Sequence, residues 1–143
     1  MEQIKIPYGE SDYKTLIEEN YIYVDKTMYI EKLENHKKSI YVRPRGFGKS
    51  LFTSMISYYY DIKEKENFEK LFKGKYIYYH PTEKKNAYYI LKFNFSGMNV
   101  SINKTEQEIE ESFNDNIYMS CRAFIQKYGL DIEIEKNKVA ATT

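Results

Sequence analysis

The stretch Arg43-Pro44-Arg45-Gly46-Phe47-Gly48-Lys49-Ser50 decides the fold that this chain is expected to adopt. It matches the pattern G-x-x-x-x-G-K-[ST] at its last three positions and departs at the first, where Arg43 replaces glycine. Glycine adopts backbone dihedrals that other residues rarely reach, so Gly46 and Gly48 allow consecutive amides to converge. Converging amides in front of a helix N-terminus favour an anion. The stretch therefore predicts a phosphate-binding loop.

The residues around the loop provide the context that this pattern needs. Ser39-Ile40-Tyr41-Val42 is short, β-branched and aromatic, which is typical of a buried strand. After the loop, apolar residues recur at helical spacing and predict a helix from about residue 49 to 61. A strand before the glycines and a helix after them favour a nucleotide site over a chance match.

Each part of the predicted site has its own role. Lys49 would reach the β and γ phosphates of ATP, and the Ser50 hydroxyl would ligate Mg²⁺. The expected cofactors are thus ATP and Mg²⁺. The alternative is a glycine-rich turn whose Lys49 and Ser50 are only solvated residues of the first helical turn. The expected nucleotide-binding residues are Arg45, Gly46, Phe47, Gly48, Lys49, Ser50 and Leu51.

Further elements extend the pattern to both sides. Apolar spacing predicts helices over about 11–19, 26–35 and 104–128, and a shorter amphipathic piece that ends at Gly74. Residues 21–24, 76–79 and 87–95 have the composition of strands. This order predicts an α/β fold: an incomplete P-loop NTPase-like three-layer βαβ unit with a parallel sheet and an N-terminal helical and extended segment.

The expected organisation is one partial domain over residues 1–143. Within it, 1–37 form a lead-in, 38–130 the P-loop core and 131–143 a tail. The 22 basic and 21 acidic side chains give a formal charge of +1, which provides no general attraction for nucleic acid or an anionic membrane. Nucleic-acid binding by the arginines of the loop is a further hypothesis, which this charge disfavours. Cys121 is the one cysteine, and no apolar run reaches the length of a membrane span. A reducing cytoplasm is the expected location.

An ordered set of motifs resembles the bacterial predicted AAA-ATPase-like family. The segments that carry the resemblance are Tyr23-Val24-Asp25-Lys26-Thr27, Arg43–Leu51, Leu71-Phe72-Lys73-Gly74 and Asn94-Phe95-Ser96. They correspond to the family's "YVDKT", "RPRRFGKSL", "LF-x-G" and "DFS" segments, over about residues 4–130. The family's loop itself begins with arginine, which accounts for Arg43. Gly46 departs from a second arginine in that loop, and Asn94 departs from a common aspartate.

The resemblance implies an ATPase whose Walker B strand lies beyond the point where this chain stops. It also implies a nuclease-like C-terminal domain of the PD-(D/E)XK type in full-length relatives. Two hypotheses follow. The chain is an ATP-binding module that lacks a catalytic carboxylate, or it is a truncated or degenerate remnant that acts as a non-catalytic interaction module. For the second, an unfinished sheet would be covered by self-association or by a C-terminal domain partner.

Overall fold

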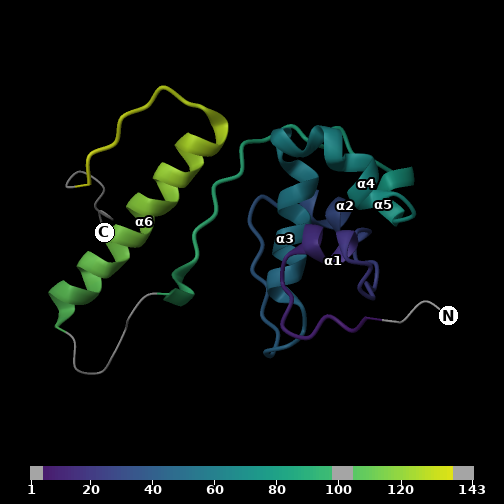
Figure 1. Cartoon of the computed structure of the whole chain (residues 1–143), viewed down its shortest axis with the longest axis horizontal. Coiled ribbons are helices and arrows are strands. Elements are labelled where there is room, and N and C mark those ends of the chain that lie inside the picture. The colour runs from purple at the N-terminus through teal and green to yellow at the C-terminus, as the bar shows by residue number, and fades with distance from the viewer. Residues whose placement is uncertain (1–4, 98–104, 137–143) are drawn as a thin grey trace. The chain divides into compact units, whose positions relative to one another are not determined.

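The computed structural model describes residues 5–97 and 105–136, which divide into two compact units on either side of the Tyr89–Ile90 bond (Figure 1). The described residues of the first unit contain five α-helices. They are α1 (Tyr13–Glu18), α2 (Tyr29–Glu34), α3 (Lys49–Tyr60), α4 (Phe68–Phe72) and α5 (Tyr76–Tyr79), with a 3₁₀ segment at Ile62–Asn67. In the second unit, a 3₁₀ turn at Phe95–Gly97 precedes the long α6 (Glu106–Tyr128).

The core of the first unit is built around α3. Its residues Met55 and Tyr59 are fully buried, and they pack in one cluster with apolar side chains from α1, α2, α4 and α5. Aromatic rings contribute much of the contact: Tyr59 lies edge-on to Phe72, with ring centroids 5.7 Å apart. The other fully buried members of this cluster are Tyr13, Ile30, Phe72 and Ile77, with Leu71 almost as deep.

Several helices predicted from apolar spacing are confirmed. α1, α2, α3 and α4 lie within or close to the expected ranges, and Gly74 adopts the left-handed conformation with φ of 78°. α6 begins at Glu106 behind a capping box formed by Thr105 and Glu108, and it ends at Tyr128, where Gly129 is the C-cap with φ of 64°. Residue 104, where that helix was expected to begin, lies outside the described residues, as does most of the expected tail, 137–143.

The expected parallel sheet and the P-loop NTPase-like βαβ architecture are wrong. The described residues contain no β-strand, and their only β pairing consists of two isolated bridges, Lys5 with Tyr21 and Asp61 with Tyr88. Segment 39–42 is not in a ladder, and its Ile40 and Val42 side chains are 92% and 76% exposed. A strand needs a neighbour for its backbone groups, and apolar composition alone does not supply one.

Residues 76–79 form helix α5 where a strand was expected. The reason lies in two side chains from a distant segment. Asp25 Oδ2 accepts a hydrogen bond from the Tyr76 amide at 2.8 Å, and Thr27 Oγ1 accepts one from the Ile77 amide at 3.1 Å. These bonds satisfy the first amides of a helix, so tertiary contacts override the strand preference of the tyrosines.

Candidate functional site

The loop of residues 43–48 leads directly into α3, and its two glycines both have positive φ. Gly46 has φ of 81°, and Gly48, the N-cap of α3, has φ of 73° and ψ of 25°. The first bond within the helix runs from the Phe52 amide to the Gly48 carbonyl at 2.9 Å. The amides of residues 49–51 precede that bond, and Gly48 has no side chain to cap them. The helix therefore presents backbone donors at the loop.

Lys49 is the first residue of α3, and its side chain folds back over the loop. Its Nζ donates hydrogen bonds to the Arg43 carbonyl at 2.6 Å and to the Pro44 carbonyl at 2.8 Å. These contacts hold the ammonium group beside the turn that contains the glycines. Thr53, one helical turn later, donates from its hydroxyl to the Lys49 carbonyl at 3.0 Å. The loop that would bind the anion therefore also positions the Lys49 ammonium group.

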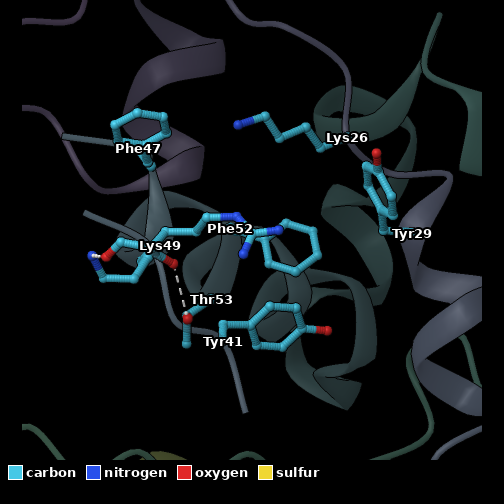
Figure 2. A pocket seen from close by; sticks show the side chains of 9 residues that line it. Lys26, Tyr29, Tyr41, Phe47, Lys49, Phe52 and Thr53 are labelled. Carbon is cyan, nitrogen blue, oxygen red and sulfur yellow. Dashed lines mark hydrogen bonds between the residues drawn. The ribbon is translucent and has the colours of Figure 1, made fainter. Parts of the chain in front are cut away.

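A cavity of about 350 Å³ opens beside this loop (Figure 2). Three cationic side chains line it: Lys26, Arg43 and Lys49. Among the described residues, no carboxylate contributes to its lining. A concave surface with one sign of charge next to helix N-terminal amides attracts an anion. The remaining lining comes from the aromatic residues Tyr29, Tyr41, Phe47 and Phe52, with Gly48 and Thr53.

The aromatic side of the cavity is formed by rings from three segments. Tyr41 and Phe52 meet edge to face with centroids 5.4 Å apart, and Tyr29 lies against Phe52 at 6.5 Å. Tyr29 comes from α2, Phe52 from α3, and Tyr41 from the chain that enters the loop. The cavity lining therefore combines cationic side chains with aromatic rings.

A second hollow, of about 320 Å³, is also lined by residues of this loop. Gly46 and Leu51 line it, and Lys26, Phe47, Gly48 and Phe52 line both hollows. Of the residues predicted for the site, the structure brings Phe47, Gly48 and Lys49 to the first hollow and Gly46 and Leu51 to the second. Arg45 and Ser50 are exposed and line neither of the two.

Lys26 is the functional candidate that the sequence analysis did not assign. Lys26 belongs to the Tyr23–Thr27 motif, so the sequence contains a signal for this residue. The motif does not indicate that Lys26 lies next to the glycine loop. The structure supplies that fact: its Nζ lies 3.7 Å from the point that a Cβ at Gly48 would occupy. The aromatic residues Tyr29, Tyr41 and Phe52 carry no local signal of a site, because their spacing fits a helix face or a strand equally well.

The comparison with protein families identifies the family of this chain. A family model described as predicted AAA-ATPase matches residues 7–142, almost the whole chain. The chain belongs to the predicted AAA-ATPase family. No curated protein and no solved structure matches it. The family description and the geometry of the loop both favour a nucleotide as the ligand. No helix within the described ranges is long and apolar enough to cross a membrane.

Proposed function

We propose that this member of the predicted AAA-ATPase family binds the phosphates of ATP at the loop of residues 43–50. The observation that carries the proposal is the arrangement around Gly48, where a left-handed glycine, the uncapped start of α3 and the Lys49 ammonium group adjoin one cationic cavity. Backbone amides and a lysine at a helix N-terminus are suited to an oxygen-rich anion.

Lys49 has the role of a phosphate-binding lysine in this proposal. Its Nζ bonds two backbone carbonyls of the loop, and a nucleotide would offer the same donor phosphate oxygens with a full negative charge. Hydrogen bonds between charged groups are stronger than bonds to neutral carbonyls. Lys49 would therefore exchange its carbonyl partners for the β and γ phosphates. Backbone donors would come from Gly46, Phe47, Gly48, Ser50 and Leu51, and Arg45 lies within the loop as an exposed residue.

Ser50 is the proposed protein ligand of Mg²⁺. It is the second residue of α3 and is exposed, so its hydroxyl is open to an ion that the phosphates bring with them. Mg²⁺ commonly takes one or two protein oxygens and completes its octahedron with phosphate and water oxygens, so a single hydroxyl fits this donor set. The ion would neutralise phosphate charge. The chain's own share in the proposal is nucleotide binding, without an assigned catalytic carboxylate.

Titration of the purified chain with Mg-ATP tests the proposal. Lys49→Ala is expected to weaken binding by about tenfold or more, because it removes a hydrogen-bonded charge. Lys38→Ala is the matched control, since it removes the same charge from an exposed residue that lines neither hollow. Equal affinity of the wild-type chain and Lys49→Ala for Mg-ATP, or no binding by the wild-type chain, contradicts the proposal.

The exposed apolar residues support a second candidate function, that of an interaction module. Ile40 and Val42 project into solvent at 92% and 76% exposure, and Phe93 and Phe95 are 43% and 45% exposed in the other unit. Apolar surfaces of this kind favour self-association or a protein partner. Sedimentation of the chain with and without Mg-ATP separates the two: a chain that associates but binds no nucleotide supports the interaction module alone.

A further inference from the structure

Lys26 is the one cationic side chain in the described part of the chain that lines both hollows at the loop. In Figure 2, it extends across the cavity from the side opposite Lys49, with its ammonium group toward Phe47. Its Nζ lies within 3.7 Å of the Cβ position at Gly48, next to the point where the amides of α3 begin. Lys26 and Lys49 thus approach the same loop from two different segments.

We infer that Lys26 is a second phosphate-binding lysine, which contacts the nucleotide from the side opposite Lys49. The inference rests on the nucleotide-binding function proposed above and extends it to a residue outside the glycine loop. The site then consists of the loop and of the segment 25–27, and it selects ligands that carry several negative charges over those that carry few. The preferred ligand class is a nucleoside triphosphate.

Hydrogen bonds on both sides of Lys26 fix its backbone. Asp25 accepts from the Tyr76 amide and, at 2.9 Å, from the Thr27 amide, so its carboxylate is engaged with backbone donors. Thr27 is completely buried, and its hydroxyl accepts from the Ile77 amide. Asp25 and Thr27 therefore anchor the segment to the first turn of α5, and the residue between them is directed at the loop.

The charges at the loop favour a polyanion over a singly charged ligand. Lys26, Arg43 and Lys49 surround one cavity, and within the described residues Lys26 forms no ion pair. Like charges gathered without counter-charges repel one another, and a ligand of opposite charge relieves that repulsion. ATP relieves it more fully than AMP because ATP brings more phosphate groups to the cavity.

Affinity measurements on charge variants of the full chain test the inference. Lys26→Gln is expected to weaken Mg-ATP binding by about tenfold or more and AMP binding much less, because it removes a charged donor to phosphate. Lys26→Arg, which keeps the charge, is expected to retain most of the affinity. Lys38→Gln is the matched control and is expected to bind as the wild-type chain does.

The results separate the inference from the function on which it rests. If Lys49→Ala loses affinity and Lys26→Gln binds Mg-ATP like the wild-type chain, the role of Lys26 is refuted and the proposed function stands. If the wild-type chain binds no Mg-ATP, both fall together.

A second measurement needs no variant and does not depend on the folding of one. Amine-reactive labelling of the wild-type chain is followed by peptide mass mapping with and without Mg-ATP. Nucleotide is expected to protect Lys26 and Lys49 and to leave Lys38 as reactive as before. Unchanged reactivity of Lys26 in a chain whose Lys49 is protected refutes the inference.

Discussion

Gly48 is subject to two separate constraints at the start of α3. Its φ of 73° lies in the left-handed region, which residues with a Cβ adopt at a cost. A Cβ there would also approach the Lys26 ammonium group at 3.7 Å, an ordinary contact, and it would stand at a residue that lines both hollows. The backbone constraint affects the stability of the fold, and the spatial constraint affects the affinity for the ligand.

Gly48→Ala is therefore expected to lower both stability and affinity. The left-handed backbone costs an alanine about 1–2 kcal/mol in free energy of unfolding, and the added methyl group is expected to weaken Mg-ATP binding. Urea denaturation and ATP titration measure the two effects.

Gly74→Ala serves as the control for Gly48→Ala. Gly74 has a similar φ of 78°, but it lies after α4 and lines neither hollow. The Gly74→Ala variant is expected to lose a similar amount of stability and to keep its affinity for Mg-ATP. Equal losses of affinity in both variants would show that strain alone, without a local effect at Gly48, accounts for the result.

The sequence could predict the loop residues but not all of their neighbours. Gly48 and Lys49 follow from a local pattern, and the predicted start of a helix at Lys49 is confirmed. The approach of Lys26 to Gly48 depends on how α5 holds segment 25–27, which is a tertiary contact without a local signal. The nucleotide roles of Arg45, Ser50 and the other loop residues stay predictions.

Asp12 links α1 to α3 and provides the clearest dependence of stability on pH. Its carboxylate caps α1 through the Thr15 amide and accepts hydrogen bonds from Ser54 and Tyr58 of α3. Burial acts to raise the pKa of Asp12, but the hydrogen bonds from Thr15, Tyr58 and Ser54 together bring it below its ordinary value of 3.8. The folded state therefore favours the ionised carboxylate.

Asp12→Ala is expected to lower the free energy of unfolding by about 0.5–2 kcal/mol at neutral pH, the usual effect of losing an N-cap. Because the pKa of Asp12 is depressed by folding, its contribution is complete above the unfolded-state value of 3.8 and is lost as the pH falls through the lower folded-state pKa. Urea denaturation across this range measures the difference between the wild-type chain and the variant.

The exposed Asp131 supplies a control for Asp12 in the other unit. Asp131→Ala is expected to change stability little at any pH. A difference between the wild-type chain and Asp12→Ala that stays constant down to the lowest pH would contradict the role given to the Asp12 carboxylate.

Helices were easier to predict than strands in this chain for a physical reason. An amphipathic helix satisfies its own backbone, so the apolar spacing of α3 and α6 and the glycines behind α4 and α6 suffice to place them. A strand depends on a neighbour that local composition does not reveal. The tyrosine-rich segment 76–79 forms a helix because Asp25 and Thr27 accept hydrogen bonds from its first two amides. Segment 39–42 does not pair in a ladder.

The division of the chain into two units places the whole candidate site in the first. Both hollows at the loop are lined by residues between 7 and 53, and the buried cluster around α3 lies before residue 78. Each of these sets falls within Met1–Tyr89. Ligand binding and the core that supports it thus share one unit.

A fragment ending at Tyr89 is expected to fold and to bind Mg-ATP within about twofold of the full chain, since it keeps every described residue of both hollows. Saturating ATP is also expected to raise its melting temperature, because a ligand that binds only the folded state stabilises it. Calorimetry and thermal scans measure both. A soluble, folded fragment without affinity, beside a full chain that binds, would place an essential residue after Tyr89.

The attachment of Asp25 and Thr27 to α5 limits how this protein can be altered. Lys26 is the single residue between Asp25 and Thr27, so the number of residues in this segment is as important as their types. An inserted or deleted residue would break the register of one anchor and rotate the intervening side chain away from the glycines, even though every amino acid type was kept. Engineers who graft this loop onto another scaffold would need to carry the short helix with it.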